Sequence, residues 1–129
     1  MTASATPLAA DAATSVPVFD RSRLEELKAM LGPALAEVLR AWLADVPGLI
    51  GALQTACDRG NAAEAALTAH ALKGSCSNVG ALRLQLLARD VEHRLRERPA
   101  ECGAASIALA QLRAEYENAA DFIRTRLDR

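Results

Sequence analysis

The residues with the clearest potential for chemistry lie between Thr68 and Ala81. This stretch holds one histidine, His70, followed closely by Lys73 and Gly74. Side chains three positions apart on a helix are neighbours, so the Lys73 ammonium can reach a group bonded to the imidazole. Neutral imidazole is a nucleophile near neutral pH, and a phosphoryl group on it would present oxygens that an ammonium can hold. We therefore predict that His70 carries a phosphoryl group and that Lys73 positions it.

The same stretch predicts a helix with two unlike faces. Helical spacing gives one apolar stripe that should contact a core: Ala65, Ala69, Leu72, Cys76 and Val79. His70 lies off this stripe, among mostly small residues: Ala63, Ala66, Leu67, Gly74 and Ser77. Glycine inside a helix costs about 1 kcal/mol relative to alanine, so Gly74 indicates a surface that another molecule approaches closely.

These residues also carry a family resemblance. The chain resembles the signature of histidine-containing phosphotransfer (HPt) domains, H-x-L-K-G-S-x-x-x-x-G-A, in His70-Ala71-Leu72-Lys73-Gly74-Ser75 and Asn78-Val79-Gly80-Ala81. The resemblance extends from about Phe19 to the end of the chain. It implies a module that accepts a phosphoryl group from a receiver-domain aspartate onto His70 and passes it reversibly to another. Such a module is an intermediate of a two-component phosphorelay.

A further site residue is expected on the helix that follows. An imidazole that reacts through one nitrogen works better when an acceptor holds its other N–H. The sequence offers Glu92, and the resemblance to HPt domains implies this role for it. The alternative is a surface carboxylate paired with Arg89 or Arg96.

The resemblance also implies a docking surface around His70. HPt domains bind the receiver domain of a response regulator there, and we expect contacts from Ala63, Leu67, Ala71, Gly74 and Ser77. Leu67 is apolar yet lies on the His70 side, as a residue of a docking surface would. The alternative is that a neighbouring helix covers Leu67.

Composition favours one helical domain. The chain has 129 residues, of which 3% are aromatic, and it is rich in Ala and Leu. Residues 1–18, rich in Ala, Thr and Pro, predict a flexible linker, and residues 19–129 the folded domain. Within the domain, Asp20 and Ser22 open a short helix that ends at Gly32, with Ser22 and Glu25 at the spacing of a capping box.

Four long amphipathic patterns follow this short helix. They cover about 33–60, with a kink near Pro47; 61–80, capped by Asn61 and ended by Gly80; 81–98; and 103 to the end. We therefore predict an all-α fold, an antiparallel four-helix bundle with a short extra N-terminal helix.

Charge, hydropathy and cysteine content argue against several classes of function and site. The net charge of −1 gives no reason to bind nucleic acid or an anionic membrane surface. No apolar run approaches the roughly 20 residues of a membrane span, and we expect a cytoplasmic location. Cys57, Cys76 and Cys102 form no C-x-x-C pair, which predicts buried free thiols with neither disulfide nor metal site.

The chain offers no glycine-rich nucleotide loop, so it should not use ATP unaided. We expect no cofactor here, with Mg²⁺ supplied by the partner receiver. The expected context is a monomeric C-terminal module of a bacterial hybrid sensor kinase, with the sensor part in the inner membrane and receivers in cis or in trans. Two alternatives stay open: the P1-like phosphoacceptor domain of a chemotaxis-type kinase, and a docking or regulatory module that never carries phosphate.

Overall fold

The fold is built from helices. In this computed structural model the backbone is described for residues 15–127 and the side chains for residues 15–126. The elements are α2 (Arg21–Leu31), α3 (Ala34–Asp58), α4 (Ala62–Val79), α5 (Leu82–Glu97), the 3₁₀ helix η2 (Pro99–Ala104) and α6 (Ser106–Leu127). No β-strand occurs in this part of the chain. The predicted all-α class is confirmed.

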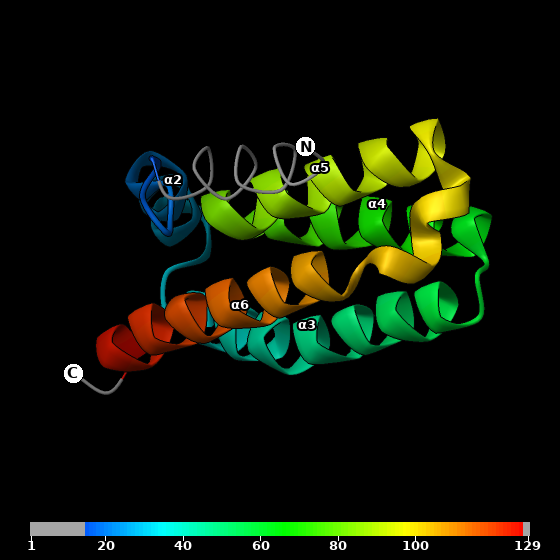
Figure 1. The fold of residues 1–129 in the computed structure, drawn as a ribbon. Coiled ribbons are helices and arrows are strands. Elements are labelled where there is room, and N and C mark those ends of the chain that lie inside the picture. Colours follow the sequence, from blue (N-terminus) through cyan, green and yellow to red (C-terminus); the bar gives the residue numbers. More distant parts are fainter. Residues whose placement is uncertain (1–14, 128–129) are drawn as a thin grey trace.

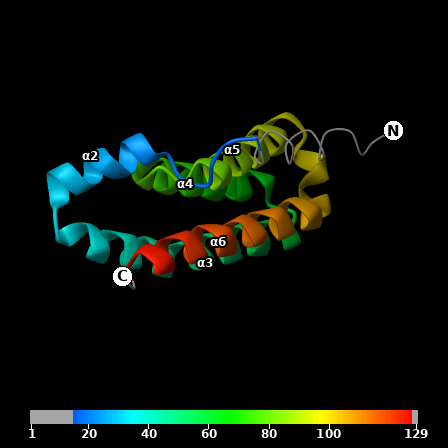
Figure 2. The same cartoon turned by 90° about the vertical axis from the view of Figure 1, so that its left-hand side faces the viewer.

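The four long helices form two layers. Figure 1 shows α3 and α6 in one layer and α4 and α5 in the other, and Figure 2 shows the same pairing from a second direction. Consecutive helices run antiparallel because the links between them, residues 59–61 and 80–81, are short. The short helix α2 lies at one end of the bundle, where it contacts α3 and α4 (Figure 1). This is the predicted four-helix bundle with an extra N-terminal helix.

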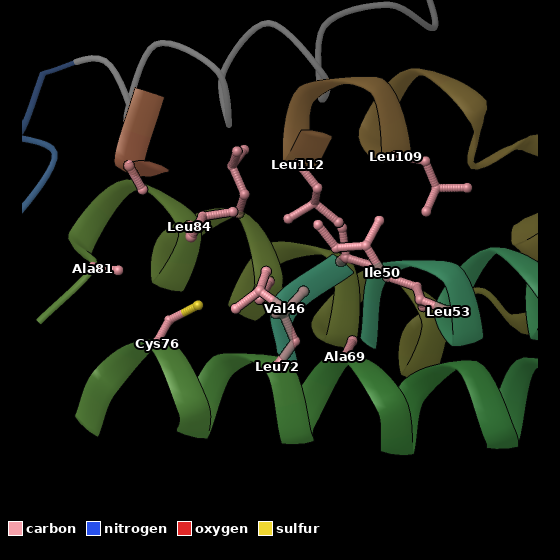
Figure 3. Close-up of a cluster of buried hydrophobic side chains, with 14 of the residues drawn as sticks. Val46, Ile50, Leu53, Ala69, Leu72, Cys76, Ala81, Leu84, Leu109 and Leu112 are labelled. Carbon is pink, nitrogen blue, oxygen red and sulfur yellow. The ribbon is translucent and has the colours of Figure 1, made fainter. Parts of the chain in front are cut away.

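The core lies between the two layers and receives side chains from all four long helices (Figure 3). Its fully buried members include Val46, Leu53, Ala69, Leu72, Cys76, Leu84 and Leu112. The whole predicted apolar stripe of α4 is buried, from Ala65 to Val79. Because that stripe is held in the core, the opposite side of α4 is directed to solvent.

Both ends of α4 are fixed as its sequence predicts. Asn61 Oδ1 accepts a hydrogen bond from the backbone N–H of Glu64 at 3.1 Å, which caps the first turn. Gly80 ends the helix with a left-handed φ of 78°, and its N–H donates to the carbonyls of Cys76 and Ser77. The position of His70 along the bundle is thereby set.

Helix α3 continues without interruption through Pro47. Proline has no N–H, so the carbonyl of Leu43, four residues earlier, loses its usual helical donor. The hydroxyl of Tyr116 on α6 donates to that carbonyl at 2.6 Å. A side chain of the neighbouring helix thus replaces the missing bond, and the single long helix is confirmed.

The start of helix α2 differs from the prediction. Asp20, not Ser22, caps α2: its Oδ1 accepts from the N–H of Arg23 at 3.3 Å, and Ser22 already lies inside the helix. A tertiary bond fixes this start, because the Asp20 N–H donates to the Gly80 carbonyl at 2.8 Å. The capping box at Ser22 and Glu25 is therefore wrong.

The predicted linker, residues 1–18, falls largely on residues 1–14, which lie outside the described residues. Its last residues are bonded to α5. The Val16 carbonyl accepts from Arg83 Nε at 2.8 Å, and the Val18 carbonyl accepts from the Leu82 N–H at 3.0 Å. Contacts with the bundle thus begin before Phe19. At the other end, η2 occupies the start expected for the last helix, which begins at Ser106.

Candidate functional site

The solvent-facing side of α4 carries His70, whose side chain is 61% exposed. The five residues expected at a docking surface are all exposed: Ala63, Leu67, Ala71, Gly74 and Ser77. Leu67 is 61% exposed, so the alternative that a neighbouring helix covers it is wrong. Ala66 is the exception to the predicted His70 face, because it is only 2% exposed and belongs to the core.

Glu92 on α5 lies directly behind the imidazole. Its Oε2 is 3.0 Å from His70 Nδ1, a hydrogen bond that joins the two helices. Among the described side chains that are polar or charged, Glu92 is the buried one, with 9% of its surface exposed. The structure therefore brings together the histidine and the carboxylate that the sequence pairs with it.

The alternative partner of Glu92 is present as well. Arg96, one turn later on α5, places Nε and Nη2 each 3.1 Å from the same Oε2. Arg89, the other arginine considered, makes no ion pair with Glu92. The sequence offered the two partners as rival explanations, whereas the folded chain satisfies His70 and Arg96 at once.

Lys73 on α4 is the third side chain that contacts Glu92, after His70 and Arg96. Its Nζ is 2.9 Å from the other carboxylate oxygen, Glu92 Oε1. Lys73 thus lies beside His70, as its spacing predicts, but its ammonium is bonded to Glu92. This cross-helix bond was missed by sequence reasoning because the register between two helices cannot be read from either helix alone.

The charge state of the Glu92 carboxyl group follows from its contacts. Burial disfavours the ionised form of Glu92, yet the hydrogen bonds from Lys73, Arg96 and His70 together lower its pKa below its ordinary value. The carboxylate is therefore ionised at neutral pH. Two basic side chains, Lys73 and Arg96, contact this single carboxylate. The surplus of positive charge beside His70 favours an anionic group there.

The geometry assigns different tasks to the two imidazole nitrogens. An ionised carboxylate only accepts hydrogen bonds, so Nδ1 must be the protonated nitrogen of the neutral ring. The lone pair then lies on Nε2, which has no hydrogen-bond partner among the described residues. An exposed nucleophilic nitrogen, held from behind and flanked by a lysine, is suited to receiving an anionic group.

Other kinds of site find little support in the described residues. No group of three or more His, Cys, Asp or Glu side chains there is arranged to hold a metal ion. The three cysteines are buried, as predicted. None of the helices described has the length and hydropathy that a membrane span requires.

Known proteins resemble this chain in sequence and in fold. The family model described as "Hpt domain" matches residues 37–122. Among solved structures, the chain is similar to histidine-containing phosphotransfer protein B (HptB) from Pseudomonas aeruginosa PAO1, with a TM-score of 0.80 and 23% sequence identity. The similarity covers 86% of this chain and 95% of that one. No curated protein matched.

Proposed function

The chain belongs to the Hpt domain family, and from this premise we propose that His70 is the residue that carries the phosphoryl group. The family makes the chain a histidine phosphotransfer module of a phosphorelay. The observation that supports His70 most strongly is the 3.0 Å bond from its Nδ1 to buried Glu92, while the ring itself is 61% exposed. One nitrogen is held and the other is accessible.

In the proposed reaction, the lone pair of Nε2 attacks the phosphorus of a receiver aspartyl phosphate. A P–N bond forms, and the P–O bond to the aspartate breaks, so the aspartate carboxylate leaves with the electron pair. No proton has to move, because Nδ1 keeps its hydrogen. The phosphorylated ring is then cationic, and the Glu92 carboxylate on Nδ1 stabilises that charge. The reverse reaction passes the group to another receiver.

The exposed side of α4 is the proposed docking surface for the receiver. Leu67 offers an apolar contact, and Gly74 has open space where a side chain would stand: a Cβ added there meets no heavy atom within 4 Å. An approaching receiver can therefore come close to His70. The receiver would supply its own aspartate and Mg²⁺, so this chain needs no cofactor.

The wider context is also part of the proposal. The module would act as a monomer in the cytoplasm and exchange phosphoryl groups with receivers in cis or in trans. Its proposed parent is a bacterial hybrid sensor kinase anchored in the inner membrane. Sedimentation of the 13.6 kDa chain at the mass of one copy would support the monomer.

To test His70, the full chain is first incubated with potassium phosphoramidate, a small phosphoryl donor. An isolated receiver domain with Mg²⁺ is then added. We expect an acid-labile, base-stable phosphoryl group whose ³¹P NMR signal is that of histidine phosphorylated on Nε2, and its transfer to the receiver. His70→Gln should take up none, whereas His93→Gln, which removes the other histidine, should react normally. Labelling that survives in His70→Gln would overturn the proposal.

A further inference from the structure

Arg96 is the one member of the charged group that the proposed reaction does not use. It lies one turn after Glu92 on α5, and two of its guanidinium nitrogens contact Glu92 Oε2 at 3.1 Å. An exposed ion pair between residues four apart on a helix contributes little to stability. Here, however, the carboxylate side chain is only 11% exposed, so its charge is poorly solvated and depends on its partners.

The two oxygens of Glu92 have separate partners. Oε2 accepts from His70 Nδ1 and from Arg96, whereas Oε1 accepts from Lys73 Nζ at 2.9 Å. Once His70 carries a phosphoryl group, Lys73 can hold the new oxygens only by sharing or giving up its bond to Oε1. Loss of that cation would leave the buried carboxylate underpaired if no other cation remained.

We propose that Arg96 is a positioning residue for phosphoryl transfer: it keeps Glu92 aligned on His70 Nδ1 through Oε2 and so allows Lys73 to turn from Oε1 to the phosphoryl oxygens. This inference rests on the proposed role of His70. Arg96 acts through Glu92, because its contacts lie behind the imidazole, on the oxygen that binds Nδ1. The carboxylate thus changes from three bonded side chains to two without losing its orientation.

The test compares rates of His70 phosphorylation by phosphoramidate, and of transfer to a receiver domain, in the full chain and its variants. Arg96→Ala should slow both by about three- to tenfold, and Arg96→Lys should recover part of the loss. Arg89→Ala is the matched control, since it removes an exposed arginine from the same helix that has no bond to Glu92. It should react at the wild-type rate.

Coupling to Lys73 separates positioning from a general structural effect. If Arg96 releases Lys73, then Lys73→Ala should slow phosphoryl transfer much less in the Arg96→Ala background than in wild type, because Lys73 stays on Glu92 there. The double variant leaves Glu92 without a cation, so its rate is compared once circular dichroism shows the helix content of wild type. Wild-type rates in Arg96→Ala, or independent effects of the two changes, would overturn the inference while His70 remains the carrier. A wild-type chain that takes up no phosphoryl group on His70 would overturn the proposed function itself.

Discussion

At the scale of single residues, the site depends on one buried carboxylate. Glu92 receives hydrogen bonds from three side chains on two helices, and these outweigh the effect of its burial on its ionisation. A buried charge that lost its partners would be strongly destabilising, whereas a fully bonded one fixes the geometry of the groups around it. The orientation of His70 and the stability of this corner of the bundle are therefore linked.

This link predicts a pH dependence of stability. Because the pKa of Glu92 is lower in the folded chain than its ordinary value of 4.5, its ionisation stabilises the fold above that value. The stabilisation should disappear as the pH falls through the lowered folded pKa. Urea unfolding of wild type and Glu92→Gln from about pH 6 to about pH 3 should show a shrinking difference in the free energy of unfolding.

Other carboxylates titrate in both proteins, so their contributions cancel in this difference. A difference that stays constant over the whole interval would mean that the ionisation of Glu92 contributes nothing to stability.

Gly74 gives the second prediction at this scale. A methyl group there meets open space, so Gly74→Ala should raise helix stability by about 1 kcal/mol. The same methyl would stand on the proposed docking surface and hold the receiver away from His70. We therefore expect transfer from a phosphorylated receiver to slow by about tenfold, with labelling by phosphoramidate unchanged.

Gly51→Ala is the control for Gly74. Gly51 lies inside α3, away from the His70 face of α4, and a Cβ there also meets nothing within 4 Å. It should show the gain in stability without slower transfer. A Gly74→Ala chain that accepts from the receiver at the wild-type rate would contradict the need for close approach.

At the scale of helices, α3 depends on α6 at Pro47. Tyr116 donates to the Leu43 carbonyl that Pro47 leaves without a donor, and burial raises the pKa of Tyr116, which keeps the hydroxyl protonated. Tyr116→Phe keeps the ring but removes the donor, and should lower the free energy of unfolding by about 1–2 kcal/mol. In a Pro47→Ala background the helix has its own N–H donor, so the same change should cost clearly less. Equal costs in both backgrounds, measured by urea unfolding, would show that the bond does not replace the missing one.

The helices themselves could largely be predicted from the sequence, because periodicity and end signals are local. Asn61 and Gly80 marked both ends of α4, and its apolar stripe is buried throughout. Ala66 was misplaced because α4 packs against both α3 and α5, which buries a wider arc than one stripe. Asp20 and Ser22 were both expected at the start of α2, and a bond from Asp20 to distant Gly80 selects Asp20 as the cap.

The site could be predicted only in part, for a related reason. The spacing of His70 and Lys73 along one helix placed them together. The pairing of Lys73 with Glu92 and the dual bonding of Oε2 require the relative positions of α4 and α5, which the pattern of neither helix contains.

At the scale of the whole molecule, the family match does not reach every part of the core. It covers residues 37–122, yet Phe19 is 1% exposed and lies outside that range. Its ring stacks on Phe122 with centroids 4.9 Å apart and meets Trp42 edge-on at 5.9 Å. The segment before α2 therefore supplies a side chain that joins α3 and α6 at one end of the bundle.

Phe19→Ala should consequently destabilise the full chain by about 3–5 kcal/mol, the usual cost of removing a buried aromatic ring. Met30→Ala is the control from the same N-terminal region: Met30 is 68% exposed, and its loss should change stability by less than about 0.5 kcal/mol. Urea unfolding followed by far-ultraviolet circular dichroism and by Trp42 fluorescence would measure both. Because a small single domain usually unfolds in one cooperative step, the two probes should give the same transition in wild type. If Phe19→Ala costs no more than Met30→Ala, the stability of the bundle does not depend on the Phe19 ring.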